Sequence, residues 1–158
     1  MLDPEQLFLP QLTALHSRTN AAFGRVVGMH LSRFRILFLL HLLGESSPGT
    51  LLKWSAADPA ALTRIMKDFE ADGLLVRRPD PADARARLVA LTEAGAARIQ
   101  QLLPLRERFI SDVLGALTPE EVRALTSLMR RVESSASALA GLPALGESFD
   151  VDPSSPGE

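Results

Sequence analysis

The cationic and hydroxyl side chains between residues 58 and 95 are the strongest candidates for chemistry in this chain. Thr63, Arg64 and Lys67 recur at helical spacing, so they share one face of a predicted helix. Further along, a short polar turn is flanked by four arginines, at positions 77, 78, 85 and 87. Such groups donate hydrogen bonds to anions and to the acceptor edges of bases, and they favour binding over covalent chemistry. We therefore interpret this stretch as a binding surface.

Elsewhere the sequence offers no constellation suited to catalysis or metal binding. No nucleophile–base pair, glycine-rich phosphate loop or carboxylate pair stands out, so we expect a protein that is not an enzyme. The chain has no cysteine, which removes disulfides, thiolate metal sites and thiol-based redox sensing. Its histidines, His16, His30 and His41, form no i, i+4 pair, so we expect no metal and no cofactor. We expect His41 to be a core residue, because it shares a helical face with Phe34 and Phe38.

Two kinds of periodicity place the binding surface on a helix and a hairpin. Asp58 can cap a helix whose first residue is Pro59, and Gly73 offers a left-handed stop. The apolar stripe of this helix consists of Leu62, Ile65, Met66 and Phe69. After Gly73 the period falls to about two, which predicts strands on both sides of a polar, proline-rich turn at residues 79–85. A helix followed by a charged hairpin is half of a winged helix-turn-helix.

This stretch resembles the MarR family of bacterial transcriptional regulators in three consecutive signatures. The family ends its recognition helix with Leu-Glu-x-x-Gly-Leu-Val, continues with a wing core Asp-Pro-x-Asp-x-Arg, and starts the next helix with Leu-Thr-Glu-x-Gly. This sequence has, in order, Phe69-Glu70-Ala71-Asp72-Gly73-Leu74-Leu75, Asp80-Pro81-Ala82-Asp83-Ala84-Arg85 and Leu91-Thr92-Glu93-Ala94-Gly95. One departure is Ala84, where the family usually has a second arginine, so we expect the wing to bind more weakly.

The resemblance implies that the helix over residues 59–73 enters the major groove of double-stranded DNA. Thr63 and Arg64 can then reach bases or phosphates, and Lys67, one turn further along, can reach phosphate. Ala60 and Ala61 are small enough to meet thymine methyl groups. The competing interpretation is that these positions form only the solvated face of a surface helix.

At the predicted hairpin tip, Arg85 is the residue that we expect to enter the minor groove, whose potential is strongly negative. Asp83 would repel phosphate on its own, so we expect it to hold Arg85 in place by a short-range ion pair. Arg87, like Arg77 and Arg78, can either touch DNA or lie on the strand surface. A plain solvated turn is the competing interpretation of Asp83 and Arg85.

Helices are predicted on both sides of this unit. On the N-terminal side, Asp3 and Pro4 open a first helix that Pro10 kinks or restarts, and Gly28 ends it. Ser32 can cap a second helix, which is apolar almost all round and so is expected at the centre of the core. Residues 45–49 predict a loop and residues 50–56 a short helix that forms the first half of the helix-turn-helix.

On the C-terminal side, Thr92 can cap a long helix that Pro104 should bend, and Thr118 starts a last helix. We thus expect a mainly α fold with a small β-wing, in which a winged helix-turn-helix core is joined to N- and C-terminal dimerisation helices. The divisions are an N-terminal dimerisation helix at 1–28, the DNA-binding domain at 29–92, C-terminal dimerisation helices at 93–141 and a flexible acidic tail at 142–158.

The two terminal regions offer more apolar helical surface than a core of about 60 residues can cover, so we expect them to meet a second copy. The resemblance implies the same, because members of the family are two-fold dimers. It also implies a cleft between the dimerisation helices and the winged domain that often binds small aromatic or phenolic anions. His16 and His30 could border that cleft, and Arg18 could supply the counter-charge.

Charge is unevenly distributed along the chain. The formal net charge is −2, yet the tail at 142–158 contains four acids and no base, so residues 1–141 carry +2. A basic hairpin on a near-neutral body is compatible with DNA binding of modest non-specific affinity. The N-terminus has no basic segment followed by an apolar one, and the apolar run at residues 36–40 is far below the ~20 residues that span a bilayer. We expect a cytoplasmic protein with no membrane partner.

These observations predict a dimeric, sequence-specific DNA-binding transcriptional regulator, a repressor that a small aromatic or phenolic ligand releases. Its operator would be a pseudo-palindrome with half-site centres about one helical turn, ~10 bp, apart. The alternative is a winged-helix module for protein interaction that has lost specific DNA binding. Ala84, the alanine-rich start of the recognition helix and the acidic tail keep this alternative open.

Overall fold

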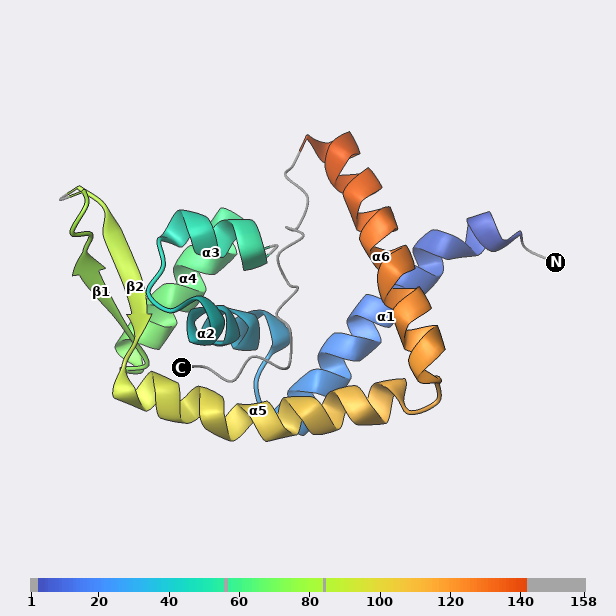
Figure 1. Ribbon diagram of the computed structural model, residues 1–158, viewed down its shortest axis with the longest axis horizontal. Coiled ribbons are helices and arrows are strands. Elements are labelled where there is room, and N and C mark those ends of the chain that lie inside the picture. Colours follow the sequence, from blue (N-terminus) through green and yellow to red (C-terminus); the bar gives the residue numbers. More distant parts are fainter. Residues whose placement is uncertain (1–2, 56, 84, 142–158) are drawn as a thin grey trace.

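The computed structural model describes residues 3–55, 57–83 and 85–141 (Figure 1). Within these residues the chain forms six helices and one two-stranded sheet. Their bounds are α1 Pro4–Val27, α2 Leu31–Leu43, α3 Pro48–Ser55, α4 Pro59–Ala71, β1 Leu75–Pro79, β2 Arg87–Leu91, α5 Glu93–Leu114 and α6 Pro119–Ala140. The expected class, mainly helical with a small β-wing, is confirmed. Two expectations lie outside the described residues: the weaker wing, which rests on Ala84, and the flexible acidic tail at 142–158.

Helix α5 connects the two ends of the molecule (Figure 1). Its first turn adjoins the β1–β2 hairpin, and α6 leaves from its far end. The N-terminal helix α1 packs against α5, and α2 packs against α3, α5 and β2. The winged helix-turn-helix, α2 to β2, therefore lies at one end of the molecule, and much of α1 and α6 extends beyond it.

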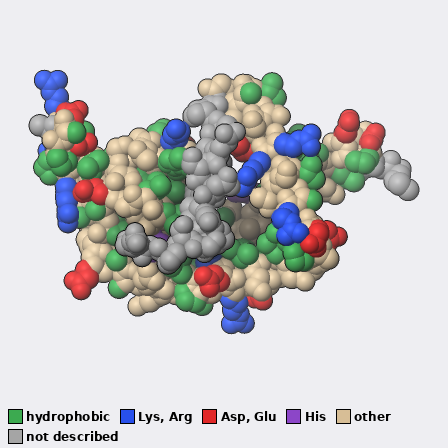
Figure 2. Space-filling model, viewed as in Figure 1, with side chains coloured by type: hydrophobic (Ala, Val, Ile, Leu, Met, Phe, Trp, Pro, Cys, Tyr) green, Lys and Arg blue, Asp and Glu red, His purple; other side chains and the backbone are tan. Residues whose placement is uncertain are grey.

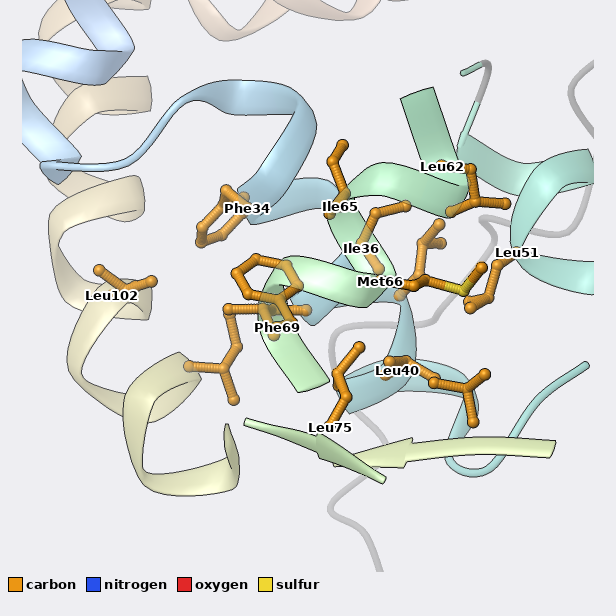
Figure 3. Close-up of a cluster of buried hydrophobic side chains, with 14 of the residues drawn as sticks. Phe34, Ile36, Leu40, Leu51, Leu62, Ile65, Met66, Phe69, Leu75 and Leu102 are labelled. Carbon is orange, nitrogen blue, oxygen red and sulfur yellow. The ribbon is translucent and has the colours of Figure 1, made fainter. Parts of the chain in front are cut away.

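The core is centred on α2, as its apolar sequence predicts. Ile36 and Leu37 have no exposed surface, and side chains from α4, α5 and β1 close around the same cluster (Figure 3). The ring of Phe23 in α1 meets the rings of Phe34 and Phe109 edge to face, with centroids 5.1 Å apart in both pairs. This aromatic contact joins α1, α2 and α5, so the long helices and the winged domain share one core.

The hairpin is antiparallel, with its register running from the pair Leu75–Leu91 to the pair Pro79–Arg87. Ser46 adds a bridge on the other edge of β2. Its N–H donates to the Val89 carbonyl at 3.0 Å, and the Val89 N–H donates to the Ser46 carbonyl at 2.8 Å. The expected loop at 45–49 is thus wrong in part, because Ser46 pairs with the wing and α3 already begins at Pro48.

Two expectations about histidines and caps need correction. His30, not Ser32, caps α2: its ring Nδ1 accepts a hydrogen bond from the Ser32 N–H at 3.4 Å, since an unprotonated imidazole nitrogen can serve as the acceptor that a cap requires. His41 is exposed and is not a core residue. Because α2 is apolar almost all round, its sequence could not show which side would face outward.

The remaining helix boundaries agree with the sequence. Gly28 and Gly141 end α1 and α6 in the left-handed conformation, Thr92 caps α5, and Thr118 forms a capping box with Glu121. Pro10 and Pro104 lie inside continuous helices, so Pro10 does not restart α1. Among the described residues no single helix is both long and apolar enough to cross a bilayer; α1 and α2 meet both conditions only as a pair, and they are bent by 68° at the break between them.

Candidate nucleic-acid interface

Helix α4 has one face fixed in the core and one face open to solvent. Asp58 caps its first turn by accepting a hydrogen bond from the Ala61 N–H at 2.9 Å, and Pro59 occupies the first helical position. The inward side chains, all buried, are Leu62, Ile65, Met66 and Phe69 (Figure 3). Burying each such side chain contributes about 1.5–3 kcal/mol. The core therefore fixes the rotation of α4 about its axis and so decides which residues face outward.

The outer face of α4 carries four of the five candidate residues of this helix. These are Ala60, Thr63, Arg64 and Lys67, all exposed, whereas Ala61 is half-buried beside the core. Together with Pro59 and Asp68, the four border a shallow hollow. The Thr63 hydroxyl donates to the Pro59 carbonyl at 2.8 Å, so its oxygen still has capacity to accept a hydrogen bond. This rigid surface combines a small side chain, a hydrogen-bond acceptor and two cations. Such a set suits the donor and acceptor pattern of a major groove.

The hairpin tip is ordered by backbone contacts of its acids. Asp83 Oδ1 accepts a hydrogen bond from the Arg85 N–H at 2.9 Å, and Asp80 Oδ1 accepts one from the Ala82 N–H at 2.8 Å. The expected ion pair between Asp83 and the Arg85 guanidinium is not among the contacts of the described residues. Asp83 fixes the turn through the main chain, and Arg85 is exposed at the end of the hairpin.

The other wing arginines differ in their surroundings. Arg77 forms an ion pair with Glu70, which ties β1 to the last turns of α4. Arg87 is exposed, and its Nη1 donates to the Ala86 carbonyl at 3.2 Å. Figure 2 shows Lys and Arg side chains at the free end of the hairpin and along its outer side. Arg77 is thus tied to α4, and Arg85 and Arg87 are exposed on the hairpin.

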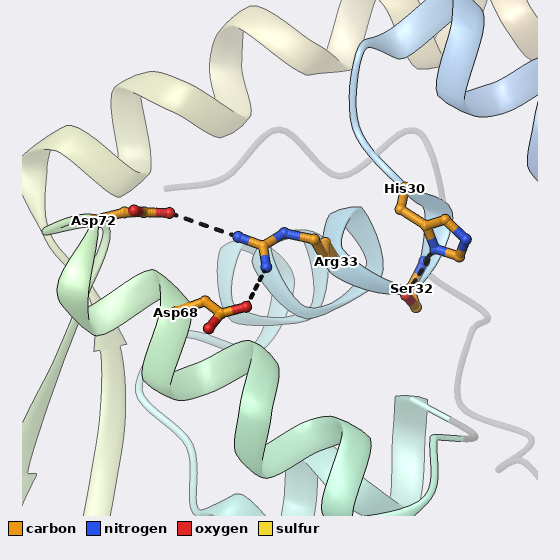
Figure 4. A network of polar contacts seen from close by, with 5 residues as sticks. All are labelled: His30, Ser32, Arg33, Asp68 and Asp72. Atoms are coloured by element: carbon orange, nitrogen blue, oxygen red, sulfur yellow. Dashed lines mark hydrogen bonds and ion pairs between the residues drawn. The ribbon is translucent and has the colours of Figure 1, made fainter.

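Two arginines of α2, which the sequence did not single out, hold the helix-turn-helix in place. Arg33 reaches α4, where its Nη1 lies 2.7 Å from Asp68 Oδ2 (Figure 4). Arg35 donates from Nη1 to the carbonyl of Ser55, the last residue of α3. Burial lowers the pKa of Arg35 from its ordinary value, because desolvation disfavours the charged form. Neither contact could be found from sequence, since the partners are 35 and 20 residues apart.

Comparisons with known proteins assign this arrangement to a family. The MarR family model matches residues 29–86, which extend from just before α2 to the hairpin tip. The chain is 34% identical over 130 residues to the uncharacterized transcriptional regulator YdgJ of Bacillus subtilis, covering 82% of this chain and 79% of YdgJ. It is 32% identical over 102 residues to the multiple antibiotic resistance protein MarR of Escherichia coli, covering 64% of this chain and 71% of MarR. The chain belongs to the MarR family.

Solved MarR-family structures share the fold. A Cys-to-Ser variant of E. coli MarR in complex with operator DNA matches with a TM-score of 0.74 and 25% identity, covering 83% of this chain and 99% of that one. A structure of Bordetella bronchiseptica BpsR, described as regulated in its DNA binding by 6-hydroxynicotinic acid, matches with a TM-score of 0.71 and 29% identity, covering 77% and 95%. The expectation of a MarR-type transcriptional regulator is confirmed, and its relatives are regulators and not enzymes.

The three residues suggested for an effector site of this MarR-family protein are exposed, and the two histidines have local partners. His16 Nε2 lies 3.0 Å from Asn20 Nδ2, and His30 Nδ1 lies 2.9 Å from Ser32 Oγ. Arg18 follows His16 by two residues on α1, about 200° around the helix. Among the described residues, no hydrogen bond or ion pair joins any two of the three. Their role in binding an effector stays a prediction.

Proposed function

We propose that this protein is a homodimeric repressor that binds a pseudo-palindromic operator through α4 and the hairpin tip, and that a small aromatic or phenolic anion releases it. The observation that carries the proposal is the division of α4 into a buried inner face and a rigid outer face with Thr63, Arg64 and Lys67. A reading helix needs this combination, because a helix that the core already holds in place loses less entropy when it binds DNA.

The apolar surface of the terminal helices supports the dimer. No described residue of α6 is buried, although its stripe includes Leu125, Leu128, Met129 and Val132, each at least 40% exposed. Near the start of α1, Leu9 and Leu12 are exposed in the same way. Apolar stripes on two long helices are expected to be covered by a partner. A second copy supplies identical stripes, and two-fold pairing would place two α4 helices at a fixed separation.

An aromatic effector is supported by a relative. BpsR, which shares the fold, is described as regulated in its DNA binding by 6-hydroxynicotinic acid, an aromatic acid. In this chain His16 and Arg18 lie on α1, and His30 lies between α1 and α2. We propose them as candidate contacts for such an anion, one or more of which the dimer would bring to the ligand.

A fluorescence anisotropy titration of the full chain against its own upstream DNA tests the proposal. Arg64→Ala is expected to weaken binding by about 1–3 kcal/mol if Arg64 reads a base, and each lost phosphate contact should reduce the salt slope by about one. Arg130→Ala on α6 is the charge-matched control. Binding that is indifferent to sequence and salt, and unchanged in Arg64→Ala, would favour the protein-interaction alternative and reject the repressor.

Footprinting and ligand screening test the finer parts. We expect protection of two half-sites whose centres lie about 10 bp apart, and a single asymmetric half-site would contradict the dimeric complex. A thermal-shift screen of small aromatic acids should yield compounds that raise the melting temperature and release the DNA. Compounds that stabilise the protein and leave DNA binding intact would contradict the proposed release.

A further inference from the structure

The second half of α4 is acidic although the helix approaches DNA in the proposed function. Asp68 and Glu70 lie near the C-terminal end of α4, Asp72 caps that end, and the last turn has no basic residue. The C-terminal end of a helix carries partial negative charge, so carboxylates there are unfavourable. Asp68 also borders the same hollow as Arg64 and Lys67. An uncompensated carboxylate at that position would repel the phosphates that the two cations attract.

Arg33 of α2 faces two of these carboxylates at once (Figure 4). Its Nη1 lies 2.7 Å from Asp68 Oδ2, and its Nη2 lies 3.6 Å from Asp72 Oδ2. Its guanidinium carbon stands 4.4 Å from the centre of the buried Phe69 ring. The guanidinium thus lies over the ring, and the two acids, four residues apart at the end of α4, lie about one turn from each other.

The three side chains differ in how much of their surface is exposed to solvent. The Arg33 side chain is 30% exposed, against 49% for Asp68 and 59% for Asp72. The cation therefore lies between the core and the acids, and the acids form the outer layer. The remaining acid, Glu70, is paired separately with Arg77 of the wing.

We propose that Arg33 is a positioning residue for DNA recognition: its one positive charge offsets half of the negative charge of Asp68 and Asp72 and so weakens the repulsion between the second half of α4 and the phosphates beside the groove. The inference rests on the proposed function, in which α4 is the reading helix. It assigns the charges of α4 two roles: Arg64 and Lys67 attract DNA on its outer face, and Arg33 reduces the opposing charge near its end.

Arg33→Gln in the full-length protein tests this role. We expect its Kd for the operator to rise about tenfold at low salt, and the difference from wild type to shrink as salt is added, because screening weakens the repulsion. Adding Asp68→Asn and Asp72→Asn to the same chain should restore the affinity to within about twofold of wild type. Arg108→Gln, which removes one cation from an exposed pair with Asp112 on α5, is the control for net charge and should bind as wild type does.

Two outcomes would overturn the role of Arg33 while the proposed function stands. One is an Arg33→Gln protein that binds the operator as tightly as wild type. The other is a loss of affinity that is equal at all salt concentrations and persists after both acids are neutralised, since a structural defect behaves in that way.

A second variant decides the matter if Arg33→Gln does not fold. Asp68→Asn combined with Asp72→Asn keeps Arg33 and should bind the operator as tightly as wild type or more tightly. Weaker binding by this variant would show that the ion pairs act through geometry and would reject neutralisation. Wild-type protein with no Arg64-dependent operator binding would instead refute the proposed function, and the inference with it.

Discussion

Asp83 acts on the wing through the backbone and not through its neighbour's charge. Its Oδ1 accepts a hydrogen bond from the Arg85 N–H, and its own carbonyl accepts one from the Ala86 N–H at 2.9 Å. These two bonds close the turn that presents Arg85. A neutral acceptor of the same shape could make the same contacts, which separates this role from the ion pair that the sequence suggested.

Substitution of Asp83 distinguishes the two roles. Asp83→Asn should keep the turn and the operator affinity, whereas Asp83→Ala should raise the Kd about fivefold, because ordering one residue costs roughly 1 kcal/mol. Anisotropy titrations of both variants provide the measurement. Equal losses in the two variants would show that the negative charge matters and would restore the ion-pair interpretation.

Gly95 shows why a motif glycine is required where α5 meets β1. A Cβ at this position would lie 2.1 Å from the Leu74 carbonyl oxygen, which already accepts a hydrogen bond from the Thr92 N–H. Gly95→Ala should therefore cost about 1–3 kcal/mol of unfolding free energy, the usual cost of overpacking. Thermal melts at one protein concentration measure it. Gly24→Ala, inside α1 with no atom within 4 Å of the added Cβ, should be neutral or stabilising; equal destabilisation of the two would contradict the steric explanation.

At the scale of elements, α2 is the helix that holds the others. It supplies the centre of the core, and its two arginines, Arg33 and Arg35, contact α4 and the end of α3. The guanidinium of Arg35 thus holds the end of α3, just before α4 begins. The position of α4 therefore depends on α2 as well as on its own apolar stripe.

Removal of the Arg35 donor should weaken this arrangement. Arg35→Met keeps an apolar stem of similar length but leaves the Ser55 carbonyl without its charged partner, which should cost about 1.5–3 kcal/mol. Arg35→Lys keeps a cation and should cost less. Urea unfolding followed by circular dichroism gives both values. If Arg35→Met unfolds at the same urea concentration as wild type, the bond to Ser55 makes no net contribution to stability. The cost of desolvating the buried guanidinium would then cancel the gain from the bond.

At the scale of the whole molecule, α6 has an apolar stripe and no buried residue among those described. Leu128 is 53% exposed in the middle of that stripe. Leu128→Glu would place a charge in the proposed dimer interface, so we expect a monomer by light scattering and a loss of operator affinity of at least tenfold, because one half-site alone remains. Arg130→Glu, about 200° around the helix, is the control and should remain a dimer. A dimeric Leu128→Glu protein would exclude this face of α6 from the interface.

Local patterns in the sequence were sufficient for most helix and strand boundaries. Asp58 with Pro59, Thr92, and the Thr118 capping box all mark helix starts in the structure as predicted, because capping involves residues within one turn of each other. The outer face of α4 was also predictable, since an amphipathic stripe assigns the opposite side to solvent. The effector contacts and the dimer remain predictions, because they depend on a second chain or a ligand.

The sequence by itself determined the order of elements, the family signatures and the residues that face outward from α4, since each depends on neighbours within about four positions. The tertiary structure decided the rest. It placed Ser46 against β2, turned His41 to solvent, and brought Arg33 onto Asp68 and Asp72. These contacts form between segments that are far apart in the chain. The orientation of each helix in the core decides which side chains meet there, and local spacing in the sequence does not show that orientation.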